Sequence, residues 1–271
     1  MSEARGRKSI FVTGAASGIG AATAKHFAKK GWFVGLFDID ETGLASIADD
    51  IGEANCLSAR LDVRNRVDWD NAVKIFGDAT EHRMNVLFNN AGIGRHGWFE
   101  DISPEDSDAV IDINVKGVIN GVYAALPLLK ETTGARIVNT ASTAGVVGSP
   151  RLAVYSASKF AVRGLTEALD IEMSELGVRV TSLMPWFVDT PILDMGDNDA
   201  SNHRMKEELE AGGQTVYPVS MAAEKAWEAA HGSDVHYMVG KHAEQARFFS
   251  RFLPGMLRKR VLKGLPSRSD I

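Results

Sequence analysis

The sequence predicts a doubly wound α/β fold, with one domain over residues 1–271 and a seven-stranded parallel sheet covered by helices on both faces. Two patterns support this prediction. Short apolar segments alternate with longer helical segments along the chain, and a glycine-rich turn joins the first such pair. Strands that are apolar throughout are typical of a parallel sheet buried on both faces. A chain of 271 residues with 45% hydrophobic content can bury such a core.

The expected elements follow one another in regular alternation. Strands are predicted at residues 8–13, 32–37, 55–61, 85–89, 135–141, 178–184 and 235–239. Helices are predicted at residues 21–30, 41–51, 64–82, 106–130, 153–176 and 221–230. Helix 106–130 is apolar around most of its circumference, which predicts burial on two sides, because a solvent-facing helix needs a polar stripe.

The glycine-rich turn, TGAASGIG at residues 13–20, lies between the first strand and the first helix. Glycines let the backbone approach a pyrophosphate, and the free N–H groups of a helix start favour an anion. Asp38 ends the second strand, at the spacing expected for a carboxylate that binds the adenosine ribose hydroxyls. A carboxylate repels a 2′-phosphate, and no arginine follows at residues 39–41, so the pattern favours NAD(H) over NADP. The alternative for Asp38 is a strand-end turn residue.

Tyr155 and Lys159 are four residues apart and therefore share one face of a helix, with Ser142 upstream. The unperturbed pKa of a phenol is about 10. An ammonium about 4 Å away, at an effective dielectric near 20, favours the phenolate by roughly 4 kcal/mol, or about three pKa units. Such a shift brings the tyrosine toward pH 7, where a general acid or base works best. Taken alone, the pair fits two ordinary residues on a helix surface better than it fits a catalytic site.

Together these motifs closely resemble those of the short-chain dehydrogenase/reductase family. The resemblance covers residues 8–190, with weaker agreement to about residue 240. The motifs appear in order as the glycine turn, Leu61-Asp62-Val63, Asn89-Asn90-Ala91-Gly92, Asn114, Ser142, Tyr155-x-x-x-Lys159 and Pro185-x-x-Val188-x-Thr190. The resemblance implies a Rossmann fold and an NAD(H)-dependent oxidoreductase.

The resemblance also implies residue roles. Tyr155 would exchange the substrate proton, Ser142 would hold the substrate oxygen, and Lys159 would bind the nicotinamide ribose and lower the Tyr155 pKa. Asn114 would hold a water of a proton relay; the alternative is a polar residue at a helix kink. The implied cofactor-binding residues are Gly14, Ser17, Gly18, Ile19, Gly20, Asp38, Asp62, Val63, Asn90, Ala91, Gly92, Tyr155, Lys159, Pro185, Val188 and Thr190.

Trp186 departs from the family pattern, which has glycine directly after the proline at 185. Its indole either packs away from the pocket or narrows it. The expected pocket wall is largely apolar, which suits a hydrophobic alcohol or ketone. Its expected members are Trp98, Phe99, Val146, Val147, Leu152, Trp186 and Phe187. Residues 190–215 match the substrate lid of the family in position, and Arg95 and His96 are expected near the mouth, where solvation is their usual role.

The tail, residues 245–271, combines apolar residues with the basic run Arg258-Lys259-Arg260. We expect its apolar side to pack on the domain or on a neighbouring subunit beside the pocket. The alternative is a peripheral membrane contact. Pro254-Gly255 counts against it, because this pair would interrupt a continuous amphipathic helix.

Composition narrows the class of protein further. A net charge of −5 and a pI near 5.8 give no reason to expect nucleic-acid binding. Cys56 is the single cysteine, which suits a reducing compartment, and the scattered histidines predict no metal site. The N-terminus lacks the apolar region of a signal peptide, and no membrane span is expected, so the predicted location is cytoplasmic.

The sequence therefore predicts a short-chain alcohol dehydrogenase or ketoreductase. It would transfer a hydride between NAD(H) and a small hydrophobic secondary alcohol or ketone. The resemblance implies a homodimer or homotetramer through helices 106–130 and 153–176. The alternatives are an NAD-dependent epimerase or dehydratase, and a dinucleotide-binding protein without catalysis.

Overall fold

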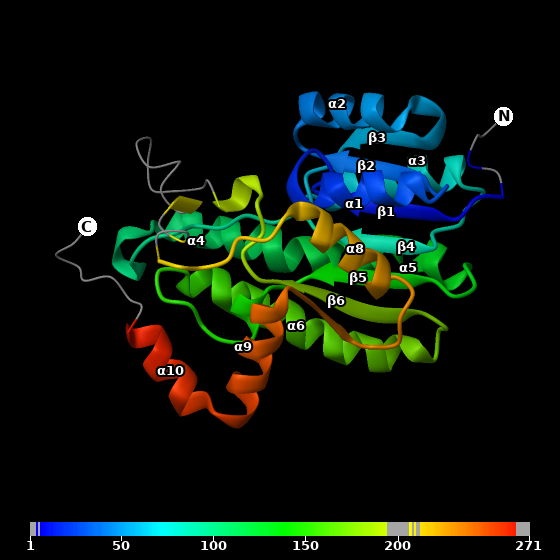
Figure 1. The fold of residues 1–271 in the computed structure, drawn as a ribbon. Helices are drawn as coiled ribbons and strands as arrows, with labels where there is room; N and C mark the ends of the chain where they lie inside the picture. The colour runs from blue at the N-terminus through cyan, green and yellow to red at the C-terminus, as the bar shows by residue number, and fades with distance from the viewer. Residues whose placement is uncertain (1–3, 5, 194–205, 208, 210–211, 264–271) are drawn as a thin grey trace.

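Seven strands form one parallel sheet in the order β3-β2-β1-β4-β5-β6-β7, which confirms the predicted fold class (Figure 1). The structure, a computed structural model, describes residues 4, 6–193, 206–207, 209 and 212–263. The expected lid therefore lies largely outside the described residues. The strands are β1 Ser9–Thr13, β2 Phe33–Asp38, β3 Cys56–Arg60, β4 Val86–Asn89, β5 Arg136–Thr140, β6 Arg179–Pro185 and β7 His236–Val239.

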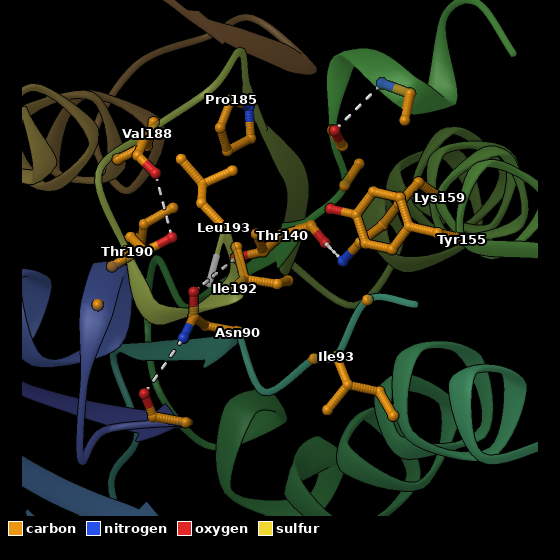
Figure 2. A pocket seen from close by; sticks show the side chains of 18 of the residues that line it. Asn90, Ile93, Thr140, Tyr155, Lys159, Pro185, Val188, Thr190, Ile192 and Leu193 are labelled. Atoms are coloured by element: carbon orange, nitrogen blue, oxygen red, sulfur yellow. Dashed lines mark hydrogen bonds between the residues drawn. The ribbon is translucent and has the colours of Figure 1, made fainter. Parts of the chain in front are cut away.

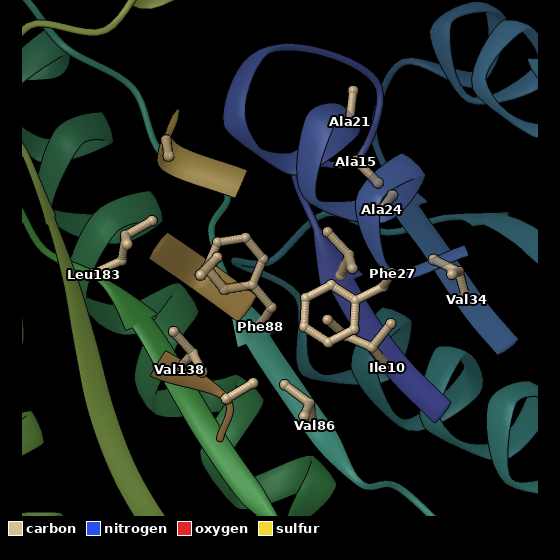
Figure 3. Close-up of a cluster of buried hydrophobic side chains, with 14 of the residues drawn as sticks. Ile10, Ala15, Ala21, Ala24, Phe27, Val34, Val86, Phe88, Val138 and Leu183 are labelled. Atoms are coloured by element: carbon tan, nitrogen blue, oxygen red, sulfur yellow. The ribbon is translucent and has the colours of Figure 1, made fainter. Parts of the chain in front are cut away.

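Helices cover both faces of this sheet because successive strand residues point to opposite sides. Ile10 packs with Phe27 on the α1 side of the sheet, where Figure 3 shows the cluster, and Phe11 packs with Phe37 and Trp69 on the other side. Helices α1, α2 and α8 supply the first cluster, and α3, α5 and α6 the second. Their bounds are α1 Gly18–Lys29, α2 Glu41–Ile51, α3 Arg66–Ala79, α5 Gly117–Lys130, α6 Ala153–Ser174 and α8 Val219–Ala229.

The predicted helix 106–130 is longer than expected and is interrupted. It begins as α4, Pro104–Ile111, because the Ser103 hydroxyl accepts a hydrogen bond from the Asp106 N–H at 3.0 Å and caps the helix. A π-helical turn at Asp112–Lys116 then leads into α5. By length and composition alone, Pro104–Lys130 is the one described helix long and apolar enough to cross a membrane. Val122, Ala125 and Leu129 of α5 are buried in the core cluster against the sheet.

The chain after β7 forms two helices that the sequence analysis did not predict, α9 Lys241–Phe252 and α10 Pro254–Lys263. Pro254 does end the first helix, as its ring requires. It also begins the second, since the first position of a helix needs no backbone donor. Figure 1 shows the pair as a hairpin that projects from the body of the molecule.

Candidate active site

A cavity of about 400 Å³ lies along the carboxyl ends of the strands (Figure 2). Its wall includes Gly14 after β1, Asp38 at the end of β2, Asn90 after β4, Thr140 at the end of β5 and Pro185 at the end of β6. Ligands of open parallel α/β sheets bind at this edge, because the loops that follow the strands converge there.

The glycine turn lies against the loop after β4, and this contact requires residues without side chains. Gly14 has a φ of +67°, and a Cβ there would lie 2.9 Å from Ala91 Cα. A Cβ on Gly20 would lie 1.9 Å from the Gly14 carbonyl oxygen. Gly18, with a φ of +52°, begins α1, and the side chain of Ser17 makes no capping hydrogen bond. The helix start thus faces the cavity with an uncapped first turn, which is the arrangement that binds phosphate.

Two carboxylates lie on the β2 and β3 side of the cavity. Asp38 Oδ2 accepts a hydrogen bond from the Ala16 N–H and Oδ1 one from the Asp40 N–H, both at 3.1 Å. These bonds hold the Asp38 carboxylate against the glycine turn. Asp62 pairs with Arg64 at 2.6 Å, and this guanidinium holds the pKa of Asp62 below its usual value. The Asp62 carboxylate is therefore charged at neutral pH.

A chain of hydrogen bonds joins the ends of β1, β4 and β5 to α6. The Thr13 hydroxyl accepts from the Asn90 N–H at 2.9 Å, and Asn90 Oδ1 accepts from the Thr140 hydroxyl at 3.2 Å. The Thr140 carbonyl then accepts from Lys159 Nζ at 2.8 Å (Figure 2). The glycine turn and Lys159 are thus held in one connected framework.

Ser142, Tyr155 and Lys159 meet on one wall of the cavity. Lys159 Nζ lies 5.5 Å from the centre of the Tyr155 ring, and the Ser142 and Tyr155 side chains are hydrogen-bonded. Burial lowers the pKa of Lys159 to about 8, so the amine keeps its proton at pH 7. Burial also raises the pKa of Tyr155, and the bond with Ser142 opposes that rise. The expected lowering of the Tyr155 pKa is not observed, because burial has the larger effect on this phenol.

Asn114 lies on the π-helical turn between α4 and α5 and is 1% exposed. Its Oδ1 accepts from the Ile93 N–H, and its Nδ2 donates to the Ile93 carbonyl, each at 2.9 Å. Nδ2 also donates to the Ser158 hydroxyl at 3.1 Å. A Cβ on Gly92 would lie 3.1 Å from Asn114 Oδ1 and 3.5 Å from Lys159 Nζ. Asn114 therefore fixes the strand-end loop beside Lys159, at a helix irregularity that the sequence analysis held open as the alternative.

Most of the residues that the sequence analysis named line the cavity. Asn114 and Gly20 are not among the lining residues, since the first bonds the loop at Ile93 and the second packs under Gly14. Of the expected pocket wall, Val147, Leu152, Trp186 and Phe187 are lining residues, as are Arg95 and His96. Trp98, Phe99 and Val146 are not, and Phe99 is largely exposed. Arg95 pairs with Asp106 at 2.6 Å at the surface.

Sequence analysis missed several lining residues. They are apolar residues, or residues beside a motif that do not belong to it: Ile39, Arg64, Ile93, Ala246, Leu257 and Val261. Ile192 and Leu193, which also line the cavity, belong to the expected lid. Leu257 and Val261 belong to α10, far along the chain from every motif. Their only signal in the sequence is the apolar character of the tail.

Both expectations for Trp186, that it lines the pocket and that it packs into the core, hold in the structure. It lines the cavity, and it also packs against two core clusters and stacks on His242 of α9, with ring centres 5.8 Å apart. The Tyr217 hydroxyl and His242 Nδ1 are 2.8 Å apart and bonded. The indole N–H of Trp186 is buried and has no hydrogen-bond partner among the described residues. Trp186 thus connects the cavity wall to α9.

The fold and this site define a dinucleotide-binding oxidoreductase of the α/β class. The chain belongs to the short-chain dehydrogenase/reductase family, because the family model described as short chain dehydrogenase matches residues 8–201. Oxidoreductase UcpA of Salmonella typhimurium is 38% identical over 190 residues, which cover 69% of this chain and 72% of that protein.

Two solved structures resemble this one over most of their length. A short-chain dehydrogenase/reductase of Burkholderia phymatum in complex with NAD has a TM-score of 0.82 and 29% identity, covering 94% of this chain and 95% of that chain. The 3-ketoacyl-(acyl-carrier-protein) reductase of Brucella melitensis, complexed with NADH, has a TM-score of 0.75 and 31% identity, covering 86% and 96% respectively.

We predict that Asn114→Ala destabilises the fold, because it leaves the part-buried N–H and carbonyl of Ile93 without their partner. Each such group costs about 1–3 kcal/mol, so the free energy of unfolding should fall by about 2–6 kcal/mol in urea titration. Asn65→Ala is a matched control, since it removes only the exposed cap of α3, which is worth about 1 kcal/mol. Equal losses in the two variants would contradict the positioning role of Asn114.

Proposed function

We propose that the protein is an NAD(H)-dependent oxidoreductase that interconverts a hydrophobic secondary alcohol and the corresponding ketone. One observation carries the proposal: a single cavity joins the glycine turn and Asp38 to Ser142, Tyr155 and Lys159. The two similar structures with NAD or NADH support the same cofactor.

The residues at one end of the cavity fit a dinucleotide. Gly14, Gly18 and Gly20 keep side chains away from the α1 start, where the pyrophosphate would bind. Asp38, held by Ala16, would accept the adenosine ribose hydroxyls. Val188 and Thr190 would lie at the nicotinamide end; a Cβ on Gly18 would be 3.2 Å from Thr190 Cγ2, so this loop packs on the glycine turn. When bound, NAD(H) supplies or accepts the hydride at the substrate carbon.

The remaining chemistry belongs to the side chains on the opposite wall. Tyr155, whose pKa is raised, carries its proton at neutral pH and would donate it to the carbonyl oxygen during reduction. Ser142 is bonded to Tyr155 and would hold the same oxygen. Lys159 would place a positive charge beside the tyrosine as the proton leaves. Asn114 acts as a positioning residue through Ile93; its role in a water relay stays a prediction.

Apolar side chains support the proposed substrate class. Apolar residues that line the cavity include Val147, Leu152, Phe187, Ile192, Leu257 and Val261. A wall of this kind favours an apolar ligand held by a few polar groups, here Ser142 and Tyr155. For assembly, exposed Tyr123 on α5 and exposed Phe160 and Ile171 on α6 support a dimer through these helices.

We predict that Tyr155→Phe lowers kcat for apolar secondary alcohols about 10²–10⁴-fold, the usual contribution of a general acid or base. NADH binding, followed by nicotinamide fluorescence, should be unchanged, since the ring is retained. Tyr123→Phe serves as the matched control on an exposed tyrosine. Unchanged turnover in Tyr155→Phe would rule out the catalytic assignment, and turnover only of charged hydroxy acids would rule out the substrate class.

We predict that kcat/KM for ketone reduction is constant below pH 8 and falls above it. The lowered Lys159 pKa of about 8 means that the positive charge beside Tyr155 is lost there, whereas Tyr155 itself keeps its proton because its pKa is raised. Lys159→Arg retains the charge at alkaline pH and should remove the fall in whatever activity it keeps. A wild-type profile that stays flat to pH 10 would contradict this role of Lys159.

We predict that Asp38→Ser combined with Ile39→Arg weakens NADH binding and strengthens NADPH binding, each by about tenfold or more. The change removes the carboxylate that repels a 2′-phosphate and adds a guanidinium that binds one. Fluorescence titration with both cofactors measures the effect. Asp40→Ser is the control, because Asp40 caps α2 through the Gly43 N–H. An unaltered preference in the double variant would mean that Asp38 does not select the cofactor.

A further inference from the structure

The C-terminal hairpin, residues 241–263, projects from the body of the molecule (Figure 1). It carries large apolar side chains that are exposed among the described residues. The exposed members are Phe248, Phe252, Leu253, Met256 and Leu262. Phe252 is 61% and Met256 is 59% exposed, on either side of the turn between α9 and α10. The rings of Phe248 and Phe252 are 5.0 Å apart, so the apolar surface is continuous along α9. Contiguous exposed apolar surface of this kind marks an interaction site.

The hairpin carries mostly positive charge, with Glu244 in the first turn of α9 as its single acidic residue. Residues 245–263 contain no aspartate or glutamate, although the whole chain has a net charge of −5. Their basic residues are Arg247, Arg251, Arg258, Lys259, Arg260 and Lys263. The Arg251 guanidinium lies 5.9 Å from the centre of the Phe252 ring, so positive charge adjoins the exposed aromatic surface. The complementary partner is therefore an anionic surface that also accepts apolar side chains.

We infer that the C-terminal hairpin docks the protein on an anionic lipid membrane. Amphipathic helices with aromatic and aliphatic residues beside lysine and arginine bind the headgroup region in this way. A second copy of the chain is a poorer partner, because a symmetric contact through the hairpin would place two basic segments against each other. The break at Pro254 does not oppose docking, since Phe252, Leu253 and Met256 at the turn are all exposed.

The hairpin also forms part of the cavity wall, so docking on a membrane would bring the cavity close to the lipid. The other side of α10 supplies Leu257 and Val261 to the wall of the cavity. Docking would hold this wall beside the lipid, where apolar alcohols and ketones partition. This last step rests on the proposed function, whereas the docking itself follows from the exposed hairpin alone.

Cosedimentation of the full chain with lipid vesicles tests the docking. We expect binding to vesicles of phosphatidylcholine mixed with phosphatidylglycerol, little binding to phosphatidylcholine alone, and release by added salt. Arg258→Glu with Lys259→Glu, and separately Phe252→Ser with Met256→Ser, should each weaken binding about tenfold or more. Val67→Ser with Ile75→Ser is the matched control, because both side chains are exposed on α3, away from the hairpin, and its binding should equal that of the wild type.

Two further measurements separate the outcomes. NADH binding and turnover of a water-soluble alcohol should be unchanged in the hairpin variants, which would show that these variants fold. If the wild type binds vesicles but turns over no alcohol, the proposed function is wrong and the docking still holds. Absence of vesicle binding overturns the inference, as does equal binding to both kinds of vesicle. If Phe252→Ser with Met256→Ser instead lowers the oligomer mass in analytical ultracentrifugation, without vesicle binding by the wild type, a second copy covers the hairpin.

Discussion

The site depends on the hydrogen bonds that tie the carboxyl ends of three adjacent strands together. Thr13, Asn90 and Thr140 follow or end β1, β4 and β5, and each uses a side chain to hold its neighbour. In a parallel sheet the ladder bonds end where the strands end, so backbone groups beyond that point need other partners. These side chains act as the partners of such backbone groups. The Thr140 carbonyl, the last in the series, accepts a hydrogen bond from Lys159 Nζ. A continuous series of hydrogen bonds therefore connects the glycine turn to Lys159.

Sequence reasoning predicted the fold and most of the cavity because both follow from local patterns. Short apolar strands, the glycine turn and Asp38 at the end of β2 depend on near neighbours in the chain, and the structure has them where they were expected. The parallel direction of the strands follows from the same alternation, since parallel strands need crossover helices.

The features that sequence reasoning missed depend on distances across the fold. The direction of Lys159 toward Thr140 comes from the meeting of β5 and α6, and the raised pKa of Tyr155 comes from its burial in the assembled site. Helical spacing places the lysine near the tyrosine but says nothing of a competing carbonyl. Likewise, Val261 reaches the cavity only because α10 folds back after Pro254, which the sequence marks simply as a break.

Burial of the charged Lys159 in the site lowers the free energy of unfolding. The pKa of Lys159 falls from 10.5 to about 8, and at about 1.4 kcal/mol per unit this corresponds to roughly 3 kcal/mol. Because the folded pKa lies below the unfolded one, the unfolded chain holds the proton more tightly. The full cost therefore applies below pH 8 and is relieved as the pH rises toward 10.5. The bond to the Thr140 carbonyl does not offset this cost, since the pKa remains low with that bond in place. A neutral apolar side chain would pack here without the penalty, so the position of Lys159 is explained by chemistry at the site rather than by stability.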